Sequence, residues 1–443
     1  MTEKKALRPP LSILWIYAFG QLGWSLANYS VASLLTYFYM PPEAADAKTL
    51  FPNFIPQATV LGLTLIGVIS FSGRLFDGFI DPIVANISDK TSSRFGKRKL
   101  FMAIAALPLA LFSYLIFKPI TEGVSSENTV WLTVTVFLFY VSLALYVIPY
   151  NALISELGHV KEDRVKISTL ISVTWAIGFL IGNLTPALQG VFEKRGLAPI
   201  DAFQTTVGIF AILSFIFMLI PVLFLNENKY AVQGEPQEDF KKSLASVFKN
   251  ANFRYFSAVY LLYWLAISFI QSGIIYYVTL LFKLDKSMAT LFGVVSFFTS
   301  FLFYPLMAYF ERKYGKKRTI LTGFILFLIV FTVVLLPISG IIRFWIITIL
   351  AAFPLAAFGI LPNTIVADIV HENEQQTGKN QAGMFYAITA FMMKVGISLS
   401  NLIFPSLLIW GKSVDNPFGV QMTVVAALIF SGLGFWVFQK YKE

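Results

Sequence analysis

The chain has 443 residues, of which 57% are hydrophobic and only 13% are charged, and its mean hydropathy is +0.71. This composition leaves too little polar surface for a water-soluble globule and predicts a membrane protein. The net charge of +10 does not indicate a nucleic-acid partner, because Lys and Arg lie in short links between apolar runs. Cysteine is absent and only His159 and His371 occur, which excludes thiol chemistry and argues against a His/Cys metal site.

Apolar runs long enough to cross a bilayer recur along the whole chain. We predict twelve transmembrane helices, at residues 11–40, 57–87, 100–118, 129–157, 166–192, 202–225, 252–282, 287–311, 319–337, 341–370, 380–410 and 418–438. The first run lacks a small-residue cleavage site, so we expect it to stay in the membrane. Most Lys and Arg fall in the links on the side of the two termini, which predicts cytoplasmic termini in a plasma-membrane protein.

Two sequence patterns repeat in the same order in the two halves of the chain. Residues 88–99 after the second span and 311–318 after the eighth each carry an acid, a base, an aromatic, Gly and a basic run. The fourth span carries Ile148-Pro149-Tyr150-Asn151, and the tenth carries Leu361-Pro362-Asn363. The repeat predicts two six-helix pseudo-symmetric bundles, at 1–225 and 252–443, joined by a cytoplasmic linker at 226–251. Short basic loops that converge through the topology rule alone are the alternative.

Three charged residues lie inside the second predicted span, where each costs about 2.5–3.5 kcal/mol on insertion scales unless it is paired or meets water. Arg74, Asp77 and Asp81 are spaced by three and four residues, which places them on one helical face. Two neighbouring carboxylates either raise the proton affinity of one of them or create a site for a monovalent cation. Lys394 is the other isolated charge within a span, and we expect it to act as counter-ion to this pair.

Two structural interpretations compete with the coupling hypothesis. Arg74, Asp77, Asp81 and Lys394 could form a static ion network that only joins helices. The Asp81-Pro82 pair could simply cap a kink near one end of the helix.

The segment 74–82, followed by 92–99, resembles the helix II signature of the glycoside-pentoside-hexuronide cation symporters, the family of the melibiose carrier. Residues 17–23, 148–153 and 383–396 resemble further segments of this family in the same order. The resemblance implies the major facilitator fold, an all-α membrane protein with twelve transmembrane helices. It also implies that Asp77 and Asp81 bind the coupling Na⁺ or H⁺, with Lys394 beside them.

The chain departs from the family at positions where sugar-transporting relatives have charged residues. Ser25 stands where sugar carriers have a carboxylate, Ser172 or Ile171 where they have an arginine, and Val147 where a further carboxylate lies near the cation. Fewer charged groups weaken the case for a galactoside-like ligand, and fewer oxygen ligands favour H⁺ over Na⁺. The sequence therefore predicts a cation- or proton-coupled symporter of a small polar solute, such as a sugar or glycoside. A carrier of an amphipathic substrate such as a lysophospholipid is the alternative that the resemblance also implies.

We expect alternating access between the two bundles of a monomer, with no cofactor besides the coupling ion. Polar or aromatic residues within spans are the candidate substrate contacts, although each could instead join helices: Ser25, Asn28, Asn151, Trp175, Gln271, Tyr276, Tyr277, Asn363 and Lys394. Residues of the two repeated basic links, with acids at helix ends, are the candidate cytoplasmic gate: Asp89, Arg94, Gly96, Lys97, Arg98, Glu156, Arg312, Gly315 and Asp368. These could equally be topology signals alone.

An enzyme is the rival class, and the sequence argues against it. HExxH, GxSxG and Walker patterns are missing from the sequence. Aspartyl intramembrane proteases use acids on separate helices, whereas Asp77 and Asp81 share one. An ion channel is disfavoured because the twofold repeat supplies rocking halves instead of a symmetric pore.

Overall fold

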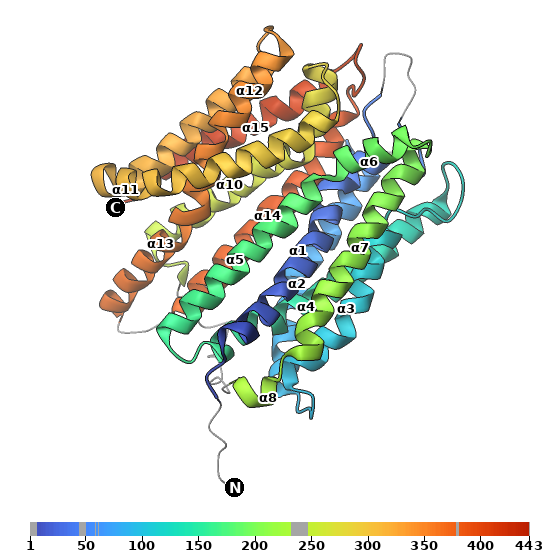
Figure 1. Cartoon of the computed structure of the whole chain (residues 1–443). Coiled ribbons are helices and arrows are strands. Elements are labelled where there is room, and N and C mark those ends of the chain that lie inside the picture. Colours follow the sequence, from blue (N-terminus) through green and yellow to red (C-terminus); the bar gives the residue numbers. More distant parts are fainter. Residues whose placement is uncertain are drawn as a thin grey trace. The chain divides into compact units, whose positions relative to one another are not determined.

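Helices account for almost all of the regular structure in the computed structural model (Figure 1). The structure describes residues 7–43, 50–57, 59–60, 62–231, 247–377 and 381–442. The elements of the first half are α1 (Leu11–Tyr39), β1 (Thr59–Val60), β2 (Leu63–Thr64), α2 (Leu65–Lys90), α3 (Lys97–Leu115), α4 (Ser126–Leu157), α5 (Lys161–Asn183), α6 (Thr185–Lys194), α7 (Pro199–Phe224) and α8 (Glu227–Tyr230). Those of the second half are α10 (Ala251–Tyr276), the π-helical turn η1 (Tyr277–Leu281), α11 (Ser287–Leu335), α12 (Gly340–Leu350), α13 (Ala352–Thr377), α14 (Ala382–Leu408) and α15 (Phe418–Phe438).

Ten helical segments of the described residues are long and apolar enough to cross a membrane. They correspond to the third through twelfth predicted spans, which confirms an all-helical membrane protein. Helices α1 and α2, 29 and 26 residues long, occupy the first two predicted spans but are not among the ten. The count of twelve spans therefore stays a prediction.

Each of the two repeated basic links contains a glycine outside the helical conformation. Within α11 the helical backbone is interrupted inside the predicted link at 312–318, at Gly315, where φ is +83°. Gly96 in the corresponding link also has a positive φ, +101°, directly before α3. Only glycine adopts this region readily, which explains why both copies of the repeated motif carry it.

The chain divides into two compact units. The first contains residues 1–40, 51–57 and 72–236, and the second contains residues 41–50, 58–71 and 237–443. Part of the α1–α2 connection and the beginning of α2 group with the second unit. The two six-helix bundles with boundaries at 225 and 252 stay a prediction. Residues 232–246 of the predicted linker lie outside the described residues.

The core of the first unit forms around α1, which packs against α5 and α7. Gly23 makes this approach possible, because a Cβ there would lie 2.6 Å from the backbone oxygen of Ser214 in α7. Tyr17 of α1 and Tyr150 of α4 stack at 4.3 Å, and each hydroxyl donates to the other residue's carbonyl. Helix α2, whose charged face is described below, approaches α4 closely at Gly73, where a Cβ would lie 2.6 Å from Val136 Cγ1.

In the second unit, α10 packs against α14 and α15, and α11 packs against α13. Gly396 allows the close contact of α14 with α10, since a Cβ there would lie 2.5 Å from the Leu261 oxygen. The Tyr263 and Phe358 rings stack at 3.8 Å between α10 and α13. Lys394 therefore lies on a helix whose neighbouring residues are fixed by close packing.

Candidate transport site and gates

Arg74 joins three helices of the first unit through its guanidinium group. Its Nη1 lies 3.5 Å from Asp77 Oδ2 on α2 and donates to Asn28 Oδ1 on α1 at 3.3 Å. Its Cζ lies 5.6 Å from the centre of the Tyr140 ring on α4. Because arginine stays protonated, it can compensate the charge of a carboxylate that has little access to water.

The two acids of α2 differ in burial, although they share one helical face. Asp77 is only 2% exposed and lies beside Arg74, whereas Asp81 is partly buried one turn further along. A buried carboxylate beside a fixed cation keeps its charge at lower cost than one without. This arrangement assigns Arg74 as the resident partner of Asp77 and leaves Asp81 as the more accessible acid.

Lys394 lies in α14, in the second unit, with a partly buried side chain. Its carbonyl accepts a hydrogen bond from the Ser398 hydroxyl at 2.7 Å. Its role as counter-ion to the α2 acids stays a prediction.

The predicted substrate residues range from exposed to buried. Asn151, Trp175 and Asn363 are exposed, and Asn28 and Gln271 are partly buried. Ser25 is 4% exposed and donates to the Leu22 carbonyl. Tyr276 and Tyr277 are buried, and the Tyr277 hydroxyl lies 3.1 Å from Thr423 Oγ1. Ser25 and Tyr277 therefore have helix-packing contacts, so the substrate hypothesis depends more on the other residues.

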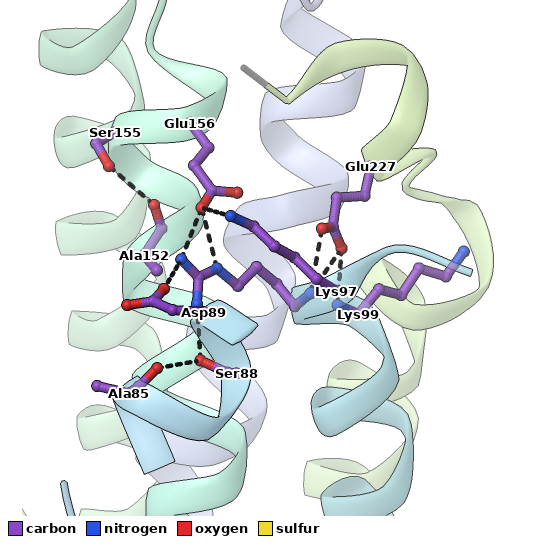
Figure 2. Close-up of polar contacts among 10 residues, drawn as sticks. Ala85, Ser88, Asp89, Lys97, Lys99, Ala152, Ser155, Glu156 and Glu227 are labelled. Carbon is purple, nitrogen blue, oxygen red and sulfur yellow. Dashed lines mark hydrogen bonds and ion pairs between the residues drawn. The ribbon is translucent and has the colours of Figure 1, made fainter. Parts of the chain in front are cut away.

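A charged cluster joins α2, α3 and α4 at the predicted cytoplasmic end (Figure 2). Arg98 donates through Nε and Nη2 to Glu156 Oε1 at 3.0 and 2.9 Å, donates through Nη1 to Ser88 Oγ at 2.7 Å, and pairs with Asp89. Lys97 Nζ lies 3.4 Å from the same Glu156 oxygen. The structure thus brings together four of the predicted gate residues, and Arg98 and Glu156 are almost fully buried.

Removing the Arg98 guanidinium from this cluster should strongly destabilise the first unit. We expect Arg98→Met to cost about 3 kcal/mol of unfolding free energy, because Glu156 would remain buried with only Lys97 beside it. Arg254→Gln, at an exposed position of α10, is the matched control and should change stability by less than about 0.5 kcal/mol. Unfolding in detergent micelles measures both. Equal stability of the two variants would contradict the structural importance of the cluster.

Glu227 is a functional neighbour of this cluster that sequence patterns did not reveal. Its carboxylate accepts the backbone N–H groups of Arg98 at 3.1 Å and Lys99 at 2.8 Å, at the first turn of α3 (Figure 2). Gly96, at the N-cap position, has no side chain to cap the helix, so Glu227 satisfies donors that would otherwise be orphaned. Asn228 Nδ2 also donates to the Arg94 carbonyl at 2.9 Å. The beginning of the predicted linker is therefore docked on the first unit.

Burial raises the pKa of Glu227 above its ordinary value, and the backbone donors of Lys99 and Arg98 partly oppose this shift. A raised folded-state pKa means that the carboxyl contributes most to stability below its ordinary pKa of about 4.3. That contribution is lost as pH rises through the folded-state pKa. We therefore expect Glu227→Gln to flatten the pH dependence of the melting temperature above the ordinary pKa of about 4.3. An unchanged profile would contradict the assignment.

The corresponding link in the second unit also makes an ion pair with a helix-end acid. Asp368 pairs with Lys316 at 2.5 Å, and Lys316 also lies 3.7 Å from Glu311. Arg312, a predicted gate residue, is exposed. Asp368 instead pairs with Lys316, which directly follows the interruption at Gly315.

A second polar contact lies at the opposite end, in the part of the α1–α2 connection that belongs to the second unit. Lys412 is 5% exposed, donates to the Pro41 carbonyl at 3.0 Å and pairs with Glu43 at 2.5 Å. Glu43 and Ser413 are also partners in a parallel β-bridge. We call these contacts of Pro41 and Glu43 with Lys412 and Ser413 the clamp. Six residues before Lys412, Ser406 Oγ accepts a hydrogen bond from Thr64 N at 3.0 Å.

Comparison with known structures identifies the fold. The fold resembles that of the D-xylose-proton symporter, with a TM-score of 0.68 and 14% identity over 98% of both chains. It also resembles a mutant form of the nucleoside transporter NupG, with a TM-score of 0.71 and 15% identity over 98% of this chain and 100% of the other. These likenesses show that the chain has the fold of the major facilitator transporters.

The chain belongs to the family described as MFS/sugar transport protein, which it matches over residues 16–429. It is 22% identical to the uncharacterized symporter YnaJ of Bacillus subtilis, over 87% of this chain and 80% of that protein. The isoprimeverose transporter of Lactiplantibacillus pentosus is 22% identical over 92% and 82%. The sodium-dependent lysophosphatidylcholine symporter 1 of Xenopus tropicalis is 22% identical over 84% and 79%.

Proposed function

We propose that this protein is a cation- or proton-coupled symporter of a small polar solute of the sugar or glycoside class. The observation that carries the proposal is an acid pair on α2 in which Asp77 is buried beside Arg74 while Asp81 is more accessible. Such charges are costly in a spanning helix and indicate an ion pathway. Relatives named as sugar transporters and glycoside symporters support the substrate class.

The coupling mechanism is electrostatic. Protonation or cation binding at Asp81 neutralises the negative charge that Arg74 does not already compensate, which lowers the cost of moving the site between the two sides. Asn28 accepts a hydrogen bond from the guanidinium that pairs with Asp77, so a solute that contacts Asn28 would sense the state of the acids. H⁺ is favoured over Na⁺, because protonation needs no shell of oxygen ligands.

The remaining parts of the proposal concern topology and gating. Twelve spans, two rocking six-helix halves, a monomer and cytoplasmic termini in the plasma membrane are the arrangement we propose. The cluster of Asp89, Lys97, Arg98 and Glu156 acts at the cytoplasmic gate, and the clamp acts at the outer gate. The clamp must release Lys412 before the outer side opens. This release costs free energy, because a buried lysine then loses its carboxylate partner.

An amphipathic substrate is the second candidate. A lysophosphatidylcholine symporter is as similar to this chain as the isoprimeverose transporter is. Ser25, and Ser172 or Ile171, are also uncharged residues at positions where the resemblance implies a charged side chain that binds sugar hydroxyls.

Uptake by proteoliposomes tests the proposed function. A panel of sugars, glycosides and lysophospholipids is offered under an imposed pH or Na⁺ gradient, and a saturable, gradient-driven accumulation identifies the substrate class. Accumulation of a lysophospholipid but no sugar would replace the first candidate by the second.

A further inference from the structure

A groove of about 560 Å³ lies between α3 and α7 of the first unit, which are neighbouring helices (Figure 1). Its edges carry strongly exposed apolar side chains, with Leu107 55% and Ile212 62% exposed. Gly208 on its floor contributes no side chain, and the Tyr114 ring lies 3.4 Å from where its Cβ would be. The groove is therefore an apolar hollow on two candidate membrane-spanning helices, away from the charged face of α2.

One end of the groove is polar. Lys118 and Asp201 both line this end, and both are exposed. Lys118 Nζ donates to Gln204 Oε1 at 2.9 Å, and the buried Gln204 donates in turn to the Phe117 carbonyl at 2.8 Å. An ammonium group whose recorded partner here is a neutral amide keeps its positive charge available for an anion.

The polar end of the groove lies where we expect the membrane–water interface. Trp131 Nε1 donates to the Lys118 carbonyl at 3.0 Å, and tryptophan is enriched at the membrane–water interface. From Asp201 to Phe215, which lines the other end, α7 advances about 21 Å at 1.5 Å per residue. This depth is roughly two thirds of the hydrocarbon core.

We propose that the α3–α7 groove binds one phospholipid that has a phosphate and a primary amine in its headgroup. Lys118 binds the phosphate, Asp201 accepts from the ammonium group, and an acyl chain fills the apolar hollow over Gly208. A polar solute does not fit this site, because the long apolar surface offers its hydroxyl groups no hydrogen-bond partners. The site is independent of the transported substrate.

Native mass spectrometry of the purified full-length protein tests the proposal, with phosphatidylethanolamine, phosphatidylcholine and phosphatidylglycerol offered at equal concentration. We expect the wild type to retain one phosphatidylethanolamine in preference to the others. Lys118→Gln should weaken its retention about tenfold, the factor for one charge-assisted hydrogen bond. Asp201→Asn should abolish the preference over phosphatidylcholine but keep phosphate binding, and Gly208→Leu should block the groove.

Matched controls separate this site from general lipid contact. Lys194→Gln removes another exposed cation of the first unit, and Gly432→Leu adds the same side chain to α15, where a Cβ meets only Leu328 at 4.0 Å. Both controls should bind the lipid as the wild type does. Equal retention of the three lipids, or equal losses in Lys118→Gln and Lys194→Gln, would overturn the proposal. Lys118→Gln changes an exposed side chain, so this result does not depend on whether Gly208→Leu folds.

Discussion

Replacing Asp81 by Asn will abolish concentrative uptake while substrate exchange continues. The substitution preserves the shape of the side chain and removes the charge that the coupling ion neutralises. With one proton carried per solute, a gradient of one pH unit supports about tenfold accumulation in the wild type. In proteoliposomes that carry Asp81→Asn, the internal concentration should only reach the external one. Wild-type accumulation in the variant would contradict the coupling role.

A test of Asp77 needs a second substitution, because Asp77 pairs with the buried Arg74. Asp77→Asn leaves the guanidinium of Arg74 buried without its carboxylate, so loss of uptake could reflect misfolding. The double variant Arg74→Gln and Asp77→Asn keeps the site neutral and is the better test. Asp415→Asn, at an exposed position in the α14–α15 connection, is the matched control and should accumulate substrate as the wild type does.

A disulfide across the clamp will arrest transport. The natural chain has no cysteine, so Glu43→Cys with Ser413→Cys creates a single pair at positions that are β-bridge partners. The Cα atoms of bridge partners lie within the range that a disulfide spans. Oxidation should fix the α1–α2 connection to the α14–α15 connection and reduce uptake at least tenfold, and reduction should restore it.

A second cysteine pair controls for oxidation itself. Ser413→Cys with Asn416→Cys lies within one connection, where Asn416 N donates to Ser413 Oγ at 3.0 Å. Its oxidation should leave uptake unchanged, because this turn does not join the α1–α2 connection. Full uptake by the oxidised Glu43 and Ser413 pair would show that the clamp does not open during transport.

Local sequence patterns predicted the helices and the charged residues that have neighbours along one helix. Hydropathy located the spans because the bilayer demands apolar runs, and spacing placed Arg74 beside Asp77 because residues three apart meet on a helix. The glycines of the repeated basic links were also informative, because the helical backbone is interrupted at Gly315 and Gly96 directly precedes α3.

Contacts between distant parts of the chain left no local signal. Glu227 caps a helix 129 residues earlier, and Lys412 pairs with a residue 369 positions away. Neither residue differs in type or spacing from other polar residues of its connection. The hydrogen bond from Arg74 to Asn28 was equally hidden, since Asn28 looked like a substrate contact on its own helix.

The most direct test of coupling is an ion flux that the substrate drives. A sugar or glycoside identified by the uptake panel is added outside proteoliposomes that contain a pH-sensitive or Na⁺-sensitive dye, with no ion gradient imposed. We predict that the substrate carries H⁺ or Na⁺ inward with it, and that Asp81→Asn abolishes this ion movement while the substrate still equilibrates. Substrate entry without movement of either ion in the wild type would contradict the account.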